Sequence, residues 1–216
     1  MNDFILGVDL DGVCGLHTEI FREIVAKELG VDEQSLPLER SWDFREWGFG
    51  PNDFERLHRV AVMEYRMFRD MEVAPGCAET LWRLSDAGIW IRVVTHRLYV
   101  NWGHAVAIAD TAHWLDQKRI PYRDVCFVGE KPDVAAHAYV DDGPHNVEGL
   151  REAGNKVITF DQPYNRHIEG PRVASWAELE TVVLKLAADH AGSVTQQLPG
   201  LDAGSERLVH KTKEQF

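Results

Sequence analysis

The sequence has few cysteines, and none of them is placed for a disulfide scaffold or a paired metal site. Its 216 residues include three, Cys14, Cys77 and Cys126, and no two of them form a CxxC pair. Such an odd and sparse set is typical of reduced thiols, and we expect a cytoplasmic protein. The ten histidines show no HExxH motif or other paired spacing, so a zinc site is not indicated.

Long apolar runs and excess positive charge are also missing. The first apolar segment ends at Asp9, and no stretch approaches the roughly 18 apolar residues of a membrane span. With 23 Lys and Arg against 35 Asp and Glu, the net charge is −12. Such a chain repels phosphate backbones and anionic membrane surfaces, so we expect neither a nucleic-acid polymer nor a membrane as partner. A small phosphorylated substrate remains compatible, because a bound metal ion can invert the field of an acidic pocket.

The apolar residues that are present, 44 % of the chain, form short runs that end in Gly or Asp. Such runs are typical of strands buried on both faces of a parallel sheet. Helical segments lie between them, and Ser175 to Glu178 has the pattern of a capping box that opens a last helix. The sequence therefore predicts a doubly wound parallel α/β sheet. The expected strands are 4–8, 89–94, 125–128, 138–140 and 156–160.

About sixty residues after the first strand contain no convincing buried strand. We expect helices over 18–29 and 52–68, with an aromatic loop between them, and interpret the segment 14–75 as a helical cap inserted into the core. The core would then comprise residues 1–13 and 76–190. Residues 191–216 are polar and aperiodic, which predicts a loosely held tail. The oligomeric state is left open.

Polar side chains follow four of the predicted strands. Asp9 and Asp11, in Asp9-Leu10-Asp11-Gly12-Val13, come after the first, and Thr95 ends the second. Lys131 follows the third strand, and Asp141-Asp142-Gly143-Pro144-His145-Asn146 follows the fourth. Each motif alone is ordinary, since Asp and Gly are common turn residues and an isolated lysine is usually a solvated surface residue. Together they would converge at the carboxyl edge of one sheet, where ligands of such folds bind.

This ordered set resembles the motifs of the haloacid dehalogenase-like superfamily over residues 1 to about 188, and the cap lies where its first subtype carries a helical cap. Several features are similar to the 5′(3′)-deoxyribonucleotidase family: the ten-residue step from Lys131 to Asp141, the segment 72–76, and 160–166 with 173–176. The resemblance implies a magnesium-dependent phosphomonoester hydrolase, most simply one that acts on nucleoside monophosphates. Phosphatase action on another small monoester, such as a sugar phosphate, and a non-catalytic binding protein on the same fold are the alternatives.

The chemistry of phosphate-ester hydrolysis assigns roles to these residues. Asp9 is the expected nucleophile, forming an aspartyl-phosphate, and Asp11 the general acid and base. Mg²⁺ prefers hard oxygen ligands, which the Asp9 carboxylate, the Asp11 backbone carbonyl and the Asp141 carboxylate would supply. Asp142 would contact these ligands and not the ion itself. Thr95, His96 and Lys131 would bind the phosphate.

Two aromatic residues of the cap are candidates for contact with the substrate. Phe44 lies in the aromatic loop, where stacking on a base and packing of the cap are equally good interpretations. Phe68 lies eight residues before Gly76, where the deoxyribonucleotidases carry base-stacking aromatics. That family has two aromatics in a row there, whereas this chain has Met67 and Phe68.

Overall fold

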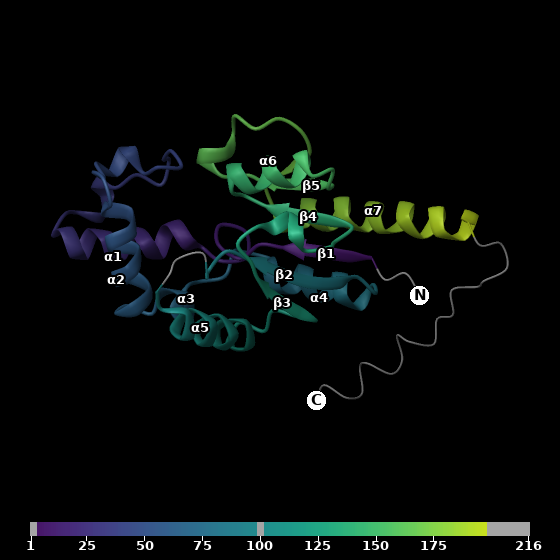
Figure 1. The fold of residues 1–216 in the computed structure, drawn as a ribbon, viewed down its shortest axis with the longest axis horizontal. Helices are drawn as coiled ribbons and strands as arrows, with labels where there is room; N and C mark the ends of the chain where they lie inside the picture. Colours follow the sequence, from purple (N-terminus) through teal and green to yellow (C-terminus); the bar gives the residue numbers. More distant parts are fainter. Residues whose placement is uncertain (1–3, 99–101, 198–216) are drawn as a thin grey trace.

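The computed structural model describes residues 4–98 and 102–197, and they form a parallel sheet with a helical cap at one end (Figure 1). The six strands lie in the order β3-β2-β1-β4-β5-β6, and every neighbouring pair is parallel. This confirms the predicted fold class. The strands are β1 (Ile5–Val8), β2 (Trp90–Thr95), β3 (Asp124–Phe127), β4 (Ala138–Asp141), β5 (Val157–Phe160) and β6 (Arg172–Val173).

Five strands lie within two residues of their predicted bounds, and β6 was missed. A two-residue strand buries too little to leave a pattern in the sequence. The helices of the core are α4 (Cys77–Asp86), α5 (His104–Gln117), α6 (Pro144–Glu152) and α7 (Trp176–Gln197), with short 3-10 turns η3 (Lys131–Asp133) and η4 (Pro163–Asn165).

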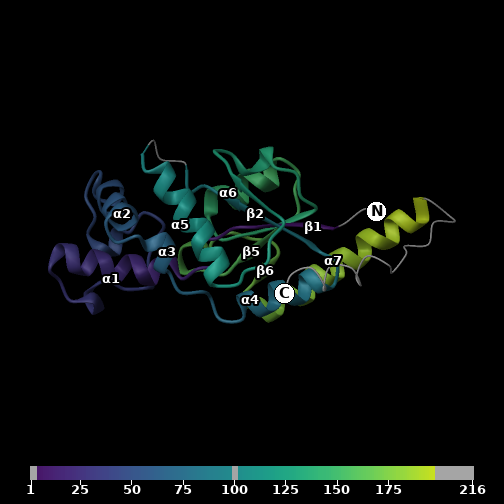
Figure 2. The ribbon, with the colours of Figure 1, turned by 90° about the horizontal axis from the view of Figure 1, so that it is seen from below.

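Helices cover both faces of the sheet, which explains why β1, β4 and β5 are buried along almost their whole length. Leu6 and Val8 of β1 pack with α4, α7 and part of α5, whereas Tyr139 of β4 packs with α6 on the opposite face. Figure 2 shows α6 on one side of the strands and the pair α4 and α7 on the other. Between Leu6 and Val8, Gly7 faces the Tyr139 ring, and a Cβ at Gly7 would lie 2.6 Å from Tyr139 Cδ1.

The cap contains α1 (His17–Leu29), α2 (Asp53–Met63) and the short α3 (Met67–Asp70), with 3-10 turns η1 (Glu33–Ser35) and η2 (Arg45–Trp47). It has an apolar core of its own, in which Phe21 of α1 contacts the rings of the aromatic loop. The single helix predicted over 52–68 is wrong. It breaks at Arg66, whose φ of 55° is left-handed and whose guanidinium binds both carboxylate oxygens of Asp110 on α5.

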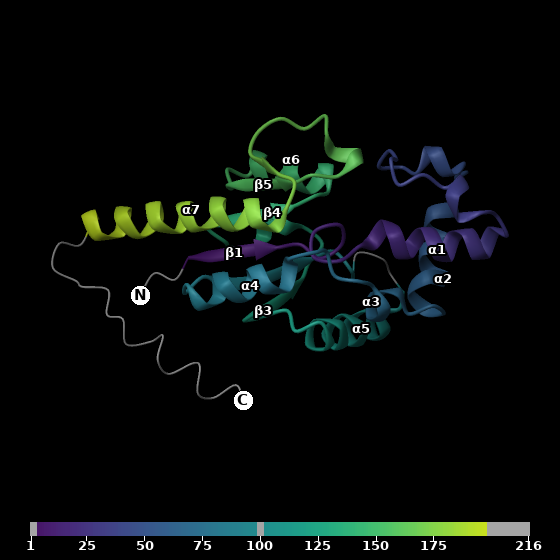
Figure 3. The same cartoon turned by 180° about the vertical axis from the view of Figure 1, so that it is seen from behind.

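The last helix, α7, extends away from the cap (Figure 3). At its start Ser175 Oγ accepts a hydrogen bond from the Glu178 backbone N–H, as the capping motif predicts. The Glu178 carboxylate, however, accepts from the backbone N–H of Ala174 instead of Ser175. The helix continues through residues 191–197, which the sequence assigns to the tail. Residues 198–216 of that predicted tail lie outside the described part of the chain.

Asn165 ties the loop after β5 to the loop after β4. Its side-chain amide donates to the backbone carbonyls of Asp142 and Phe160, both at 2.8 Å. Its side-chain oxygen accepts from the backbone N–H of Gln162 at 3.1 Å and from Arg172 Nη1 at 2.6 Å. The side chain is buried, so these four bonds fix the backbone that carries Asp142.

We therefore expect Asn165→Ala to destabilise the protein strongly. Each buried polar group left without a hydrogen-bond partner lowers the free energy of unfolding by about 1–3 kcal/mol. The substitution removes the partner of more than one of the groups bonded to Asn165. Urea denaturation would measure the loss. Gln117→Ala, on the exposed end of α5, is the control and should change the free energy of unfolding by less than about 0.5 kcal/mol. Equal stability of the two variants would contradict this role of Asn165.

Candidate active site

Three of the predicted site residues meet at the carboxyl edge of the sheet. The ammonium of Lys131, on the turn after β3, lies 2.7 Å from Asp9 Oδ1 and 2.6 Å from Asp141 Oδ2. Asp9 follows β1 directly and its backbone N–H donates to the Val140 carbonyl of β4, which holds the nucleophile candidate against the neighbouring strand. Only 1 % of Lys131 is exposed, so a surface-lysine interpretation no longer applies.

The buried carboxylates outnumber the cation among them. Side-chain oxygens of Asp9, Asp141 and Asp142 lie within 4.8 Å of one another, and all three residues are buried. Burial, opposed by the Lys131 charge and reinforced by Asp141 and Asp11, raises the pKa of Asp9 to about 7. Burial and the charges of Asp9 and Asp141 also raise the pKa of Asp142 well above its usual range. Despite its burial, Lys131 has a raised pKa because Asp141 and Asp9 stabilise its charge.

This donor set fits a hard divalent cation. Three carboxylates that can share one ion are hard oxygen ligands, and a single ammonium does not neutralise them. Asp142 was predicted to orient the ligands, whereas its carboxylate lies in the same cluster as those of Asp9 and Asp141. Its Oδ2 accepts a hydrogen bond from the Tyr164 hydroxyl.

The turn after Asp11 is compact, and a glycine is required in it. The N–H groups of Cys14 and Gly15 both donate to the Leu10 carbonyl, so the chain reverses immediately after the two acids. Gly12 has a φ of 82°, and a Cβ there would lie 2.2 Å from Asp142 Oδ2. The sequence motif therefore needs Gly12 both for its backbone conformation and for the close approach of Asp142.

Asp11 is held by a residue that the sequence analysis missed. Arg97 Nε lies 3.0 Å from Asp11 Oδ2, and Arg97 Nη2 lies 2.7 Å from Oδ1. Burial alone would raise the pKa of Asp11, but the charge and hydrogen bonds of Arg97 outweigh it and lower the pKa to about 2. The signal in the sequence was a basic residue two positions after Thr95, on the same loop.

Thr95 and His96 lie at the end of β2. The Thr95 hydroxyl is buried and accepts a weak hydrogen bond from the Arg97 backbone N–H at 3.4 Å. His96 Nε2 is buried and has no hydrogen-bond partner among the described residues. Burial, with the Lys131 charge, lowers the pKa of His96, which favours the neutral ring, and its unpartnered nitrogen is available to a ligand.

The two cap aromatics occupy different surroundings. Phe44 is buried among Phe21, Trp47, Phe49 and Phe54, in contacts that suit packing of the cap. Phe68 is also buried, with 2 % exposure, but Arg97 covers its ring at 4.2 Å from the centroid. Phe68 is thus linked through Arg97 to Asp11, whereas the ring contacts of Phe44 are with other residues of the cap.

Two histidines near Asp11 were also not predicted as site residues. His17 opens α1 and His58 lies on α2, with their ring centroids 5.9 Å apart. Desolvation lowers the pKa of His17 to about 4 and that of His58 to about 3, although the Asp11 charge opposes both shifts. Both rings are therefore neutral at pH 7. Their signal in the sequence was weak, because a single His in a helix is usually structural.

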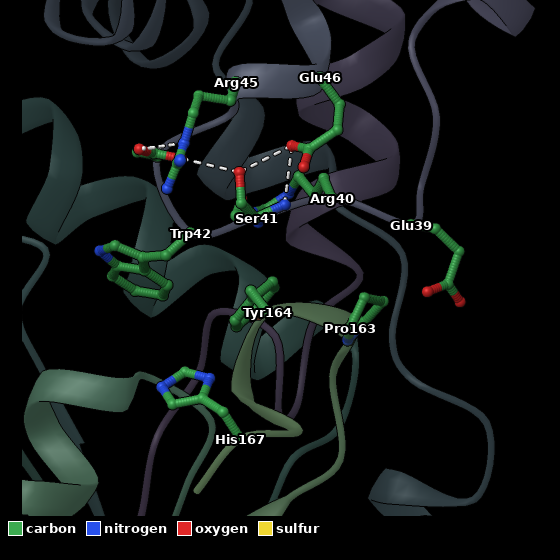
Figure 4. Close-up of a pocket in the computed structure, with 10 residues that line it drawn as sticks. Glu39, Arg40, Ser41, Trp42, Arg45, Glu46, Pro163, Tyr164 and His167 are labelled. Carbon is green, nitrogen blue, oxygen red and sulfur yellow. Dashed lines mark hydrogen bonds and ion pairs between the residues drawn. The ribbon is translucent and has the colours of Figure 1, made fainter.

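A pocket of about 570 Å³ lies between the cap loop and the turn after β5. Figure 4 shows Arg40 and Trp42 of the cap facing Tyr164 and His167 of the core across it. The Arg40 guanidinium lies 4.4 Å from the Tyr164 ring centroid, and Trp42 packs edge-on at 5.3 Å. Of the residues that line the pocket, Tyr164 is hydrogen-bonded to the acidic cluster, through Asp142 Oδ2.

Comparison with known proteins decides the family. The family model described as 5′ nucleotidase, deoxy (Pyrimidine), cytosolic type C protein matches residues 3–189. The chain belongs to this nucleotidase family. A putative 5′(3′)-deoxyribonucleotidase of Chlorobaculum tepidum is 44 % identical over 185 residues, covering 84 % of this chain and 91 % of that protein. A 5′(3′)-deoxyribonucleotidase of Bacillus subtilis is 29 % identical over 146 residues, covering 66 % and 77 %.

Solved structures show which fold the chain shares. A haloacid dehalogenase family hydrolase from Deinococcus radiodurans, solved with phosphate and sodium, aligns with a TM-score of 0.60 at 15 % identity, covering 85 % of this chain and 96 % of that one. A haloacid dehalogenase-like protein from Streptococcus pneumoniae aligns at 0.57 and 14 % identity, covering 83 % and 98 %. Both confirm the predicted fold. No helix within the described residues is long and apolar enough to span a bilayer.

We expect Asp9→Asn to reduce turnover roughly 10³-fold or more, because an amide is a poor nucleophile of nearly the same shape. The protein should unfold at the same or a higher temperature, since the change removes one of several crowded buried carboxylates. Phosphate release and thermal denaturation would measure the two effects. Asp133→Asn, on the exposed end of the Lys131 turn, should leave both unchanged. A variant at residue 9 with a tenth of the wild-type rate would contradict nucleophilic catalysis by Asp9.

Proposed function

We propose that this nucleotidase-family protein hydrolyses nucleoside monophosphates with magnesium, through a covalent phosphate on Asp9. The observation that carries the proposal is the buried cluster of Asp9, Asp141 and Asp142 with Lys131 at the carboxyl end of β1. A non-catalytic binding protein has no need of such a costly set of buried charges. Family membership supports the same chemistry.

The residues divide the reaction into two steps. In the first, an Asp9 carboxylate oxygen attacks phosphorus, the bond to the ester oxygen breaks, and Asp11 gives that oxygen a proton. In the second, water attacks the phosphorus of the aspartyl-phosphate, Asp11 takes the water proton, and the Asp9 carboxylate is regenerated. Thr95, His96 and Lys131 bind the phosphoryl oxygens, and the unpartnered His96 Nε2 supports that role.

The Asp9 carboxylate, the Asp11 backbone carbonyl and the Asp141 carboxylate are the residues that would hold the cation. A bound Mg²⁺ supplies positive charge for the phosphoryl oxygens and allows a dianionic ester to approach the acidic cluster. Asp142 would either bind the cation as a further ligand or orient the other ligands. Asp141 is itself oriented, since its Oδ1 accepts from the Gly143 N–H at 3.0 Å and from Asn146 Nδ2 at 3.1 Å.

The surroundings of Asp11 support a nucleoside as the leaving group. The group that receives the proton must lie beside Asp11, and the neutral rings of His17 and His58 are near it. Arg97 is already paired with the Asp11 carboxylate, so it is not free to bind a second phosphate. An uncharged leaving group with an aromatic face fits these neighbours better than a charged one. Phe68, one face of which lies against Arg97, would offer its other face to the base.

A panel of phosphomonoesters tests the substrate. We expect deoxynucleoside monophosphates to give a higher kcat/KM than ribose 5-phosphate, because only the nucleotides carry a base. Comparing 5′- and 3′-phosphates of the same nucleoside shows which ester is preferred. If ribose 5-phosphate were the best substrate, the protein would be a sugar-phosphate phosphatase and not a nucleotidase. If no ester released phosphate, the proposed activity would be wrong.

We infer a cytoplasmic location for this nucleotidase. Its three cysteines are free thiols in the structure, and two of them, Cys14 and Cys77, are buried. Free thiols are typical of proteins in the reducing cytoplasm, whereas proteins of oxidising compartments usually carry disulfides.

Activity should require Mg²⁺ and disappear when a chelator removes it. The physical reason is that the acids at this site outnumber Lys131 and Arg97, and a divalent ion supplies the positive charge that a phosphate dianion needs there. Phosphate release would be measured after EDTA treatment and again after Mg²⁺ or Zn²⁺ is added. Recovery with zinc but not with magnesium would contradict the proposed ligand set.

Phe68→Ala should lower kcat/KM for a nucleotide. The loss should correspond to about 1–3 kcal/mol of binding energy, the size of a lost base-stacking contact. The rate with p-nitrophenyl phosphate, which has no base, should change little. Tyr122→Ala, an exposed aromatic that precedes β3, is the control and should affect neither substrate. Parallel losses on both substrates would show that Phe68 only packs the cap, and no loss on either would remove it from the site.

A further inference from the structure

Arg97 binds both carboxylate oxygens of Asp11 at once. Its Nε and Nη2 lie 3.0 and 2.7 Å from Oδ2 and Oδ1, in the two-point geometry that fixes the plane of a carboxylate. The Asp11 side chain itself is only partly covered, with 27 % exposure, and lies on a turn rather than in a strand. Without Arg97, the described contacts leave the Asp11 carboxylate free to rotate.

Arg97 is in turn held on every side. Its Nη1 donates to Thr111 Oγ1 at 3.0 Å, and the Thr111 hydroxyl donates to the Ala107 carbonyl at 2.7 Å within α5. The Phe68 ring centroid lies 4.2 Å from the guanidinium carbon and that of Trp114 lies 5.6 Å away. With 5 % exposure, Arg97 is a rigid support rather than a mobile surface charge.

We propose that Arg97 is a positioning residue for Asp11 and fixes its carboxylate in the orientation that serves proton transfer to the leaving oxygen. The inference rests on the proposed role of Asp11 as proton donor, a role in which Arg97 supplies orientation although its charge favours the ionised carboxylate. We do not assign Arg97 as a phosphate ligand, because each of its three nitrogens already donates to Asp11 or Thr111 and the Phe68 ring lies over its face. Its contribution to the reaction therefore passes through Asp11.

The chemistry of the leaving group separates this role from a merely structural one. When the phosphorus–oxygen bond breaks, the electron pair stays on the ester oxygen, which needs a proton from Asp11 if the anion is poorly stabilised. Phenolate is such a leaving group, whereas p-nitrophenolate leaves readily without a proton. Phenyl phosphate and p-nitrophenyl phosphate both carry a single benzene ring and no base, so stacking on Phe68 does not distinguish them.

The test compares kcat/KM, which reports the first chemical step, for the two aryl phosphates in wild-type protein, Arg97→Met and Arg97→Lys. General acid catalysis contributes roughly 10²–10⁴-fold, so a misplaced Asp11 should cost at least about tenfold more on phenyl phosphate than on p-nitrophenyl phosphate. Arg97→Lys keeps the charge but loses the two-point geometry, so it should recover only part of the difference.

Arg66→Met is the matched control. Arg66 also binds both oxygens of a carboxylate on α5, Asp110, at 2.7 and 2.5 Å, yet neither residue contacts Asp11. Thermal denaturation of the Arg66 and Arg97 variants would compare the structural losses. We expect Arg66→Met to leave the ratio of the two aryl-phosphate rates unchanged, whatever its stability.

The double variant Asp11→Asn with Arg97→Met shows whether Arg97 acts through Asp11. If it does, removing Arg97 adds no further dependence on the leaving group once Asp11 is gone. An unchanged rate ratio in Arg97→Met, or a change that persists in the Asp11→Asn background, would overturn the inference while leaving the hydrolase intact. A wild-type protein that hydrolyses neither ester nor any nucleotide would instead remove the proposed function, and the role of Arg97 with it.

Discussion

Lys131 lies between Asp9 and Asp141, with its ammonium in contact with both carboxylates and almost closed to solvent. Burying one charge costs several kcal/mol unless partners compensate, and each of these three charges is tolerable only because of the others. The partners come from three strands. Since β2 separates β3 from β1, these strands lie two strand spacings apart, about 9–10 Å, and the lysine on the turn after β3 and the aspartate side chains bridge that distance together. The strand order thus decides whether the site exists.

The residues that sequence could identify are those whose meaning is local. Asp9, Thr95, Lys131 and Asp141 each follow a buried apolar run, and in a parallel sheet all such positions lie on one edge. The order of the motifs along the chain was therefore enough to predict the fold and the meeting of Asp9, Lys131 and Asp141. No contact between distant side chains had to be known.

The residues that were missed depend on distant partners. Arg97 is informative only beside Asp11, 86 residues earlier, and Thr111 on α5. The break before α3 follows the same logic, because Arg66 is fixed by Asp110, 44 residues away. An apolar pattern that continues from α2 into α3 hides such a break. The neutrality of His17 and His58 likewise comes from the desolvation that folding imposes, which a sequence motif does not encode.

The cap contacts two of the acids through separate residues. Phe68 covers the guanidinium that holds Asp11, and Arg40 covers the ring of Tyr164, whose hydroxyl binds Asp142. Packing of the cap and orientation of the acids are therefore not independent. A substrate that binds against the cap also affects the supports of Asp11 and Asp142. Binding energy from the part of the substrate that does not react can then be expressed in the chemical step, so that selectivity appears in kcat as well as in KM.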